Sequence, residues 1–305
     1  MYIRKSILIK KSPKEIFSLI NDFHKWSKWS PWLIADPKTK LMIENHGKFY
    51  SWNSEIIGSG SMQILTEEPN ESVAYNLIFL TPWKSQARID IFLNEKKEGT
   101  EVVWTMKSQL PFYLFWMKKS MQIYVGMDYE RGLLLLKDYA EHEKVFSKLE
   151  FNGIKTCEET LYLGFKRECS FTTFEEQMTT DFQKVMPYIM ENHKEAIKGN
   201  PFALYHKFNP VKDKVVYTIG IPISKVFKEL NSEYFIKRLP KMNVHSILHI
   251  GKCQHLANAW SAQMMYQRSK QFKSKKRLPP FEVYLNSPTD TPEHKLKTEV
   301  LFPVV

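Results

Sequence analysis

The sequence predicts an α+β protein with two domains, and three observations support this fold class. A capped helix is followed by many strand-like segments with a period of two, and then by a long helical stretch. The C-terminal half contains two similar series of strand, helix, strand and strand. The chain has 305 residues and 43% hydrophobic content, which suits two domains of ordinary size. We expect these domains at residues 1–148 and 154–305.

The N-terminal half opens with a strand at residues 2–10, followed by a short helix. Ser12 is placed to cap this helix, with Pro13 at its first position and Glu15 three residues after the cap. This is the pattern of a capping box, in which the serine and the glutamate satisfy each other's backbone donors.

Strand-like runs then follow between residues 41 and 110, separated by turn sequences. Apolar residues recur at helical spacing from residue 113 to about 149, and Gly126 and Gly132 are candidate positions for a break. This order predicts a helix-grip arrangement, in which a curved antiparallel sheet wraps the C-terminal helix. Such a sheet and its helix leave a hollow between them.

Six aromatic residues are placed by their order in the chain to line this hollow. At strand and helix spacing, each of them is also compatible with an ordinary core position. They are Phe79, Trp83, Trp104, Tyr113, Phe115 and Tyr124.

The first half contains five further motifs in this order: Trp29-Ser30-Pro31-Trp32, Tyr50-Ser51-Trp52, Gly58-Ser59-Gly60-Ser61-Met62, Gly99 to Trp104 and Gly132 to Lys137. They give the first half a resemblance to the SRPBCC superfamily, in particular its START-like, polyketide cyclase/dehydrase-like branch. It implies a pocket for apolar small molecules. It supplies no shared nucleophile, so cyclase activity does not follow from it.

In the second half we expect residues 143–153 to join the domains and residues 156–166 to form a strand. Thr173 to Glu176 has the pattern of a second capping box, and it opens a helix with Met178 and Phe182 on its apolar face. Pro187 should kink this helix or end its regular part.

Two short motifs recur about 80 residues apart. Pro201-Phe202-Ala203-Leu204-Tyr205 is echoed by Pro280-Phe281-Glu282-Val283-Tyr284, and Ile221-Pro222-Ile223 by Phe302-Pro303-Val304. An internal duplication of a βαββ unit, at about 155–225 and 240–305, accounts for this. Two such units would pair about a pseudo-twofold axis, where a groove would contain Ala203 from one copy and Glu282 from the other.

Glu282 is unusual because it places a carboxylate in an otherwise apolar strand. The period of two puts Glu282 and Tyr284 on the same side. A carboxylate on a half-buried sheet is costly unless a cation or hydrogen-bond donors meet it. Either this side chain is solvated at a sheet edge, or it faces a ligand.

A series of short motifs closes the second half. It consists of Pro-Phe-Glu-Val-Tyr-Leu-Asn from Pro280, followed by Pro288, Thr291-Pro292, Thr298-Glu299 and Phe302-Pro303-Val304. With this signature, residues 155–305 resemble the GyrI-like, or AraC-type effector-binding, family. The resemblance implies that Glu282 is the central carboxylate of an aromatic-walled cleft for bulky, often cationic, planar compounds, as in multidrug binding.

A delocalised organic cation needs aromatic faces and one carboxylate. Tyr284, Tyr205 and Trp260 are the candidate walls, and Tyr217 is a further candidate whose strand register is not fixed. Each is also compatible with an ordinary core position.

Three function classes follow. The main hypothesis is a cytoplasmic protein that binds a small hydrophobic or cationic aromatic molecule and does not contact DNA, because both capped helices precede strands rather than a recognition helix. The resemblance to the GyrI-like family implies an alternative, a hydrolase that detoxifies a cyclopropane-type electrophile, with Glu282 as general base beside Tyr284. The third is a protein that shields another macromolecule.

The content of charged residues, cysteine and histidine indicates which partners, compartment and cofactors to expect. Lys and Arg exceed Asp and Glu by 44 to 33, but the cations are scattered, and the one dense run, Lys273 to Arg277, suits a solvated helix end. We therefore expect neither nucleic acid nor membrane as a partner. Three separated cysteines indicate free thiols in a reducing compartment. His245 and His249 are four apart in an expected strand, which does not favour a metal site, and no cofactor is expected.

Overall fold

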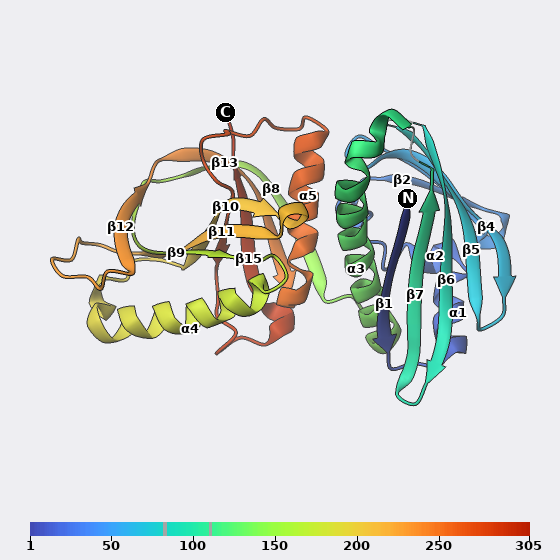
Figure 1. Cartoon of the computed structure of the whole chain (residues 1–305), viewed down its shortest axis with the longest axis horizontal. Coiled ribbons are helices and arrows are strands. Elements are labelled where there is room, and N and C mark those ends of the chain that lie inside the picture. The colour runs from blue at the N-terminus through green and yellow to red at the C-terminus, as the bar shows by residue number, and fades with distance from the viewer. Residues whose placement is uncertain (82–83, 110–111) are drawn as a thin grey trace. The chain divides into compact units, whose positions relative to one another are not determined.

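The computed structural model describes residues 1–81, 84–109 and 112–305, without the side chains of 112–114. The chain is a mixed α+β protein with two large antiparallel sheets and few helices. It divides into two compact units: the first consists of Met1–Lys148 and Met264–Ser269, and the second of Leu149–Gln263 and Lys270–Val305. Each unit contains one of the sheets (Figure 1).

The sheet of the first unit has seven strands in the order β1-β7-β6-β5-β4-β3-β2. Strands β2 to β7 thus follow one another as a meander, and β1 pairs with β7 at the edge. The strands are β1 (Tyr2–Ile9), β2 (Lys40–Glu44), β3 (Phe49–Ser54), β4 (Gly58–Glu68), β5 (Ser72–Thr81), β6 (Ser85–Lys96) and β7 (Gly99–Ser108).

Helices pack against this sheet around one hydrophobic core. Helix α1 (Pro13–Ile20) contacts β5 and β6, and α3 (Lys118–His142) contacts β1 and β7. Between them lie the short α2 (Phe23–Trp26) and the 3-10 turns η1 (Asn45–Gly47) and η2 (Phe112–Met117). The capping box that opens α1 is confirmed, because the Ser12 hydroxyl accepts from the Glu15 amide and the Glu15 carboxylate from the Ser12 amide.

Helix α3 is continuous, so the expected break at Gly126 or Gly132 is wrong. Gly132 serves close packing, because a Cβ there would lie 2.7 Å from the indole ring of Trp104. The helix also ends at His142, earlier than expected, where Glu143 takes a left-handed conformation.

The sheet of the second unit has eight strands in the order β12-β9-β11-β10-β14-β15-β13-β8. Around the central β10–β14 pair the order is symmetric, with β11 and β9 on one side and β15 and β13 on the other. The strands are β8 (Ser147–Cys157), β9 (Thr160–Cys169), β10 (Phe202–Asn209), β11 (Lys214–Pro222), β12 (Tyr234–Leu239), β13 (Met242–Gly251), β14 (Phe281–Tyr284) and β15 (Lys297–Pro303).

Two strands differ from the expectation. Residues 147–153 of the segment expected to join the domains belong to β8, which lies at the sheet edge beside β13 and buries Ser147 and Leu149 on alternate positions. The strand expected at 156–166 is therefore the end of β8 and the start of β9. Strand β12 carries no strong alternation of exposure and was not expected.

Helix α4 (Phe174–Asn192) packs on β9 and β11, and it contains Pro187. The second capping box is wrong: Thr173 has φ −107° and ψ 4°, outside the extended region, and its hydroxyl accepts no cap hydrogen bond. Four 3-10 turns complete the unit: η3 (Lys194–Ala196), η4 (Pro210–Lys212), η5 (Cys253–His255) and η6 (Glu293–Lys295).

Helix α5 (Ala257–Arg268) follows η5. Lys273 to Arg277 therefore lies beyond the helix, where Ser274 forms a bridge with Val304, so the helix dipole does not explain this basic run. Among the described residues, no helix is long and apolar enough to cross a membrane.

Candidate functional site

Glu282 lies on β14 at the centre of the eight-stranded sheet. Its direct cross-strand partner on β10 is Ala203, the two positions that the sequence placed opposite each other. The side chain of Ala203 is one methyl group, so it leaves room for the longer carboxylate beside it. Glu282 is only 3% exposed.

Three uncharged donors converge on the Glu282 carboxylate. The Tyr284 hydroxyl donates to Oε2 at 2.6 Å, and the Tyr205 hydroxyl donates to the same oxygen at 2.9 Å. The indole N–H of Trp260, from α5, donates to Oε1. Within the described part of the chain, no lysine, arginine or histidine forms an ion pair with Glu282.

The pKa values of this cluster reflect burial. Burial raises the pKa of Glu282 above its ordinary value, and the hydrogen bonds from Tyr284, Trp260 and Tyr205 offset only part of that increase. Burial also raises the pKa of Tyr205 and of Tyr284 far above 10, and the neighbouring Glu282 charge adds to both shifts. The two hydroxyl groups therefore stay protonated and remain donors at neutral pH.

Aromatic rings surround these donors. Tyr205 meets Trp260 edge-to-face with ring centroids 4.9 Å apart, and Phe182 of α4 meets Tyr284 in the same way at 5.2 Å. The Met178 sulfur lies 3.7 Å from the Tyr205 hydroxyl and 3.9 Å from that of Tyr284. Because each hydroxyl hydrogen is given to Glu282, we read the sulfur as a packing contact.

The structure thus brings Tyr205, Tyr284 and Trp260 together at Glu282. Tyr217 does not join them, because its hydroxyl donates to Asp181 Oδ2 at 2.6 Å instead. Residues 205 and 217 are cross-strand partners on β10 and β11, but their hydroxyl groups serve different carboxylates.

Asp181 is a second buried carboxylate, 1% exposed, that sequence reasoning missed. Arg167 holds both of its oxygens, at 2.9 and 2.6 Å, and Gln177 donates at 3.1 Å. Burial opposes ionisation of Asp181, but the hydrogen bonds from Arg167 and Tyr217 outweigh it and lower the pKa. A signal was present, since Asp181 stands in the apolar stripe of α4, beside Met178 and Val185 at helical spacing.

The first unit contains a separate cavity of about 50 Å³. Two of the expected residues, Phe79 and Trp104, line it. Trp83 and the side chain of Tyr113 fall outside the described residues. Phe115 and Tyr124 are not among the lining residues, because they are 74% and 45% exposed. The other lining residues are Trp26, Ser30, Trp32, Leu33, Tyr50, Trp52, Ile57, Met62, Leu77, Ile89 and Tyr129.

Several lining residues belong to the sequence motifs of the first half, although only Phe79 and Trp104 are among the expected pocket residues. Trp26 and Trp104 are each 1% exposed, and their indole rings meet edge-to-face at 5.3 Å. Neither indole N–H has a hydrogen-bond partner within the described residues. Burial raises the pKa of Tyr50 and of Tyr129, so the lining carries no charge at neutral pH from either phenol.

The residues described do not bring three His, Cys, Asp or Glu side chains together in a way that could hold a metal. His245 and His249 are both buried in β13. His245 hydrogen-bonds through Nδ1 to Gln263 at 2.7 Å, and burial lowers the pKa of His249 to about 4.

Comparisons with known proteins point to one family. The model of the GyrI-like small molecule binding domain matches residues 153–305, which is half of the chain. A search of curated proteins found no match.

Several solved structures are similar to parts of the chain. Protein MLL2253 from Mesorhizobium loti is 12% identical, with a TM-score of 0.38, over 48% of this chain and 100% of that one. The Aha1 dimer from Colwellia psychrerythraea is 20% identical, with a TM-score of 0.36, over 47% and 98%. SAV2435, solved bound to tetraphenylphosphonium, is 15% identical, with a TM-score of 0.40, over 51% and 94%.

Proposed function

Because this chain belongs to the GyrI-like family of small-molecule-binding domains, we propose that its second unit binds a bulky aromatic cation at Glu282. One observation carries this proposal. Glu282 is a buried carboxylate that meets three neutral donors and, within the described residues, no cation. The other buried acids described in this unit each have a cation: Asp181 pairs with Arg167 and Glu299 with Lys155.

Glu282 lacks a positive counter-charge from the described residues of the protein. A buried carboxylate without a cation is costly, and three hydrogen bonds offset only part of that cost, as the raised pKa of Glu282 indicates. A ligand that brings a positive charge removes the remaining penalty. An anion, or a neutral compound of the same shape, would gain no comparable binding free energy at Glu282.

The surrounding rings fit a ligand whose charge is spread over an aromatic framework. Tyr284 and Trp260 are half-buried, so part of each ring is reachable from solvent while Glu282 is not. Ring faces attract a delocalised cation by roughly 0.5 to 2 kcal/mol each, depending on how dry the contact is. We therefore assign Tyr284, Trp260 and Tyr205 as walls and Glu282 as the charge partner, and we leave Tyr217 out.

Tetraphenylphosphonium is a suitable probe because its charge does not depend on pH and its four phenyl rings supply apolar area. Glu282→Gln keeps the size of the side chain and removes its charge. We expect calorimetric or fluorescence titration to show binding at least about tenfold weaker in this variant, or roughly 1.4 kcal/mol. Neutral triphenylphosphine oxide should bind both proteins equally.

Glu299→Gln is the matched control. Glu299 is also buried in this unit, at 7% exposure, but it is paired with Lys155 and hydrogen-bonded to Ser246. This variant should keep the affinity of the natural protein. Equal affinities of the natural protein and Glu282→Gln for tetraphenylphosphonium would end the proposal.

A hydrolase is the second candidate, and the raised pKa of Glu282 is the observation that favours it. A carboxylate with a raised pKa is a stronger general base for water, and Tyr284 lies at hydrogen-bond distance to assist. Both Glu282 oxygens already accept hydrogen bonds, however, which favours binding over catalysis. Conversion of a cyclopropane-type electrophile that disappears in Glu282→Gln, followed by mass spectrometry, would support the hydrolase; binding without product would not.

For the first unit we propose a helix-grip domain of the SRPBCC type, with START-like and polyketide cyclase-like relatives, that takes an uncharged apolar compound. The supporting observations are the meander that ends in α3 and the neutral, aromatic cavity. The cavity is smaller than the few hundred Å³ of a typical drug site, so binding would require its side chains to move apart.

Three further features belong to the same proposal. The symmetric strand order around β10 and β14 supports a duplicated βαββ layout within 154–305, with 1–148 as the preceding domain. The free thiols of Cys157, Cys169 and Cys253 support a cytoplasmic protein. Nothing in the ligand chemistry of Glu282 calls for direct contact with nucleic acid.

A further inference from the structure

Exposed aromatic side chains gather at one end of the first unit. Five Phe, Tyr or Trp side chains are exposed in the described part of the chain, and four of them belong to this end. They are Tyr2 at 47%, Phe115 at 74%, Trp116 at 69% and Tyr124 at 45%. We call these four residues the aromatic end; the fifth exposed ring is Phe92, on β6.

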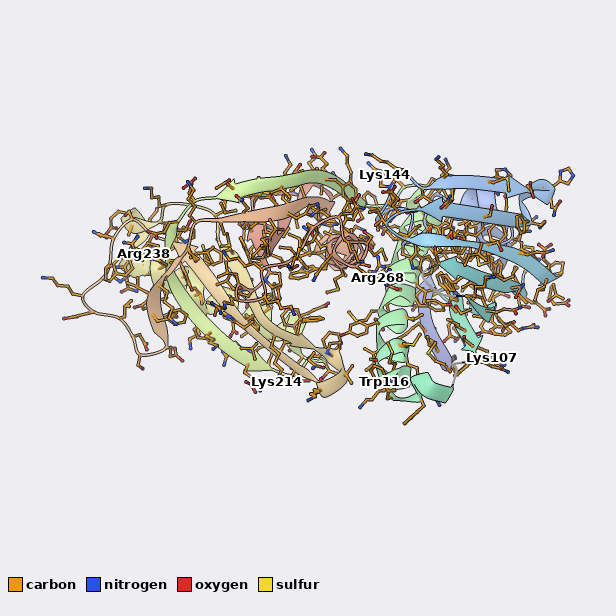
Figure 2. The ribbon with its side chains drawn as sticks, turned by 90° about the horizontal axis from the view of Figure 1, so that it is seen from above. Lys107, Trp116, Lys144, Lys214, Arg238 and Arg268 are labelled. Carbon is orange, nitrogen blue, oxygen red and sulfur yellow. The ribbon has the colours of Figure 1, made fainter. Side chains whose placement is uncertain are left out.

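The pairing of the elements shows that these residues share one region. Tyr2 at the start of β1 pairs with Lys107 near the end of β7. The side-chain amide of Gln122, in the first turns of α3, donates to the Tyr2 carbonyl at 3.0 Å. Phe115 and Trp116 belong to η2, the turn that directly precedes α3. Figure 2 shows Lys107 and Trp116 along the same edge of the first unit.

The charged residues closest in sequence to Phe115, Trp116 and Tyr124 are mostly lysines. Residues 102–127 contain no Asp or Glu, and their charged residues are Lys107, Lys118 and Lys119. All three lysines are exposed. Rings and cations are therefore interleaved in the sequence and lie on the same end of the fold.

We propose that the aromatic end docks on an anionic lipid surface. Tryptophan and tyrosine rings prefer the boundary between lipid headgroups and acyl chains, because each has an apolar body and a polar edge. Lysines beside them are attracted to anionic headgroups, and their alkyl chains tolerate the apolar neighbour. Exposed rings at a helix start, with lysines beside them, suit a fluid anionic surface better than a shaped protein pocket, which would need a complementary polar rim. The nearest acids along α3 already have cations, because Asp128 pairs with Arg131 and Glu130 with Lys5.

This proposal replaces the expectation that the protein has no membrane partner. It concerns contact with the surface, as in proteins that lie on a bilayer without crossing it. It is independent of the ligand site at Glu282, which is built from residues of the second unit only.

Sedimentation with vesicles tests it. The 305-residue protein should bind vesicles of phosphatidylglycerol and phosphatidylcholine, bind pure phosphatidylcholine at least tenfold more weakly, and lose affinity as salt is raised. Phe115→Ser combined with Trp116→Ser should weaken binding at least tenfold, and so should Lys118→Glu combined with Lys119→Glu. Because these side chains are exposed, both variants should keep the thermal unfolding temperature of the natural protein.

Phe92→Ser is the matched control, because it removes an exposed ring elsewhere in the same unit and should leave vesicle binding unchanged. Vesicles with brominated acyl chains should quench tryptophan fluorescence in the natural protein, and Trp116→Phe should remove most of that quenching.

Two results would overturn the proposal. One is equal vesicle binding by the natural protein and by the Phe115→Ser, Trp116→Ser variant. The other is absence of binding to anionic vesicles by the natural protein. If, in addition, the Phe115→Ser, Trp116→Ser variant changes the protein from dimer to monomer, the rings would be assigned to contact with a second protein copy.

Discussion

Lowering the pH should weaken tetraphenylphosphonium binding by protonating Glu282. The ligand keeps its charge at every pH, so any pH dependence belongs to the protein. Burial raises the pKa of Glu282 above 4.5, so in the folded protein this carboxylate takes up its proton at a higher pH than an exposed glutamate would. Affinity should be constant at high pH and fall as the pH drops through that raised pKa.

The size of the loss follows from the geometry. A cation about 5 Å from the carboxylate gains roughly 3 kcal/mol at an effective dielectric constant of about 20. Desolvation of both charges removes part of this gain. We therefore expect the protonated site to bind at least about tenfold more weakly, or roughly 1.4 kcal/mol, as measured by calorimetric titration at a series of pH values.

The titratable tyrosine and cysteine side chains near Glu282 do not contribute to the pH dependence of binding between pH 5 and 8. Tyr205 and Tyr284 have pKa values raised well above 10, and burial raises the pKa of Cys253 above 9. None of them changes charge between pH 5 and 8. Glu282→Gln should bind weakly and show no such pH dependence. A flat profile in the natural protein, or the same profile in the variant, would refute the reasoning.

Three further predictions follow from single contacts. Asp181→Asn should lower the free energy of unfolding in urea by about 2 kcal/mol, which is less than for a fully buried ion pair, because Arg167 is 34% exposed. An unchanged free energy of unfolding would contradict a stabilising role of the pair. Gly220→Ala should cost about 1 to 3 kcal/mol in the same assay, because its Cβ would lie 2.2 Å from the Phe202 ring; an unchanged stability would contradict that packing. Tyr284→Phe removes a hydrogen bond that lowers the pKa of Glu282, so the pH midpoint of tetraphenylphosphonium binding should rise; an unchanged or lower midpoint would contradict the assigned bond.

Sequence periodicity was most informative where one face of a strand is buried. The period of two placed Glu282 and Tyr284 on one side, and the repeated motif placed Ala203 opposite Glu282. Both positions follow from local geometry, because a one-residue slip would turn every side chain to the other face. The mixed α+β class followed from the same patterns.

Long-range pairing is what the sequence could not provide. The hydroxyl group of Tyr217 donates a hydrogen bond to Asp181 because α4, which carries that acid, packs on β11. The sequence of β11 alone does not show which helix will pack on it. The start of strand β8 is difficult to recognise in the sequence. It lies at the edge of the sheet, where most of its residues stay partly exposed, so few of its positions are reserved for apolar side chains. Phe115 and Tyr124 were placed in a pocket because their ring type suggests burial, whereas the end of the fold where they lie leaves them exposed.

The crystal structure of the protein with tetraphenylphosphonium tests the central claim most directly. We predict the phosphonium beside the Glu282 carboxylate, with phenyl rings against Tyr284 and Trp260 at centroid distances of roughly 4.5 to 7 Å. A ligand bound elsewhere, without contact to Glu282, would contradict the claim that this carboxylate is the charge partner of the site.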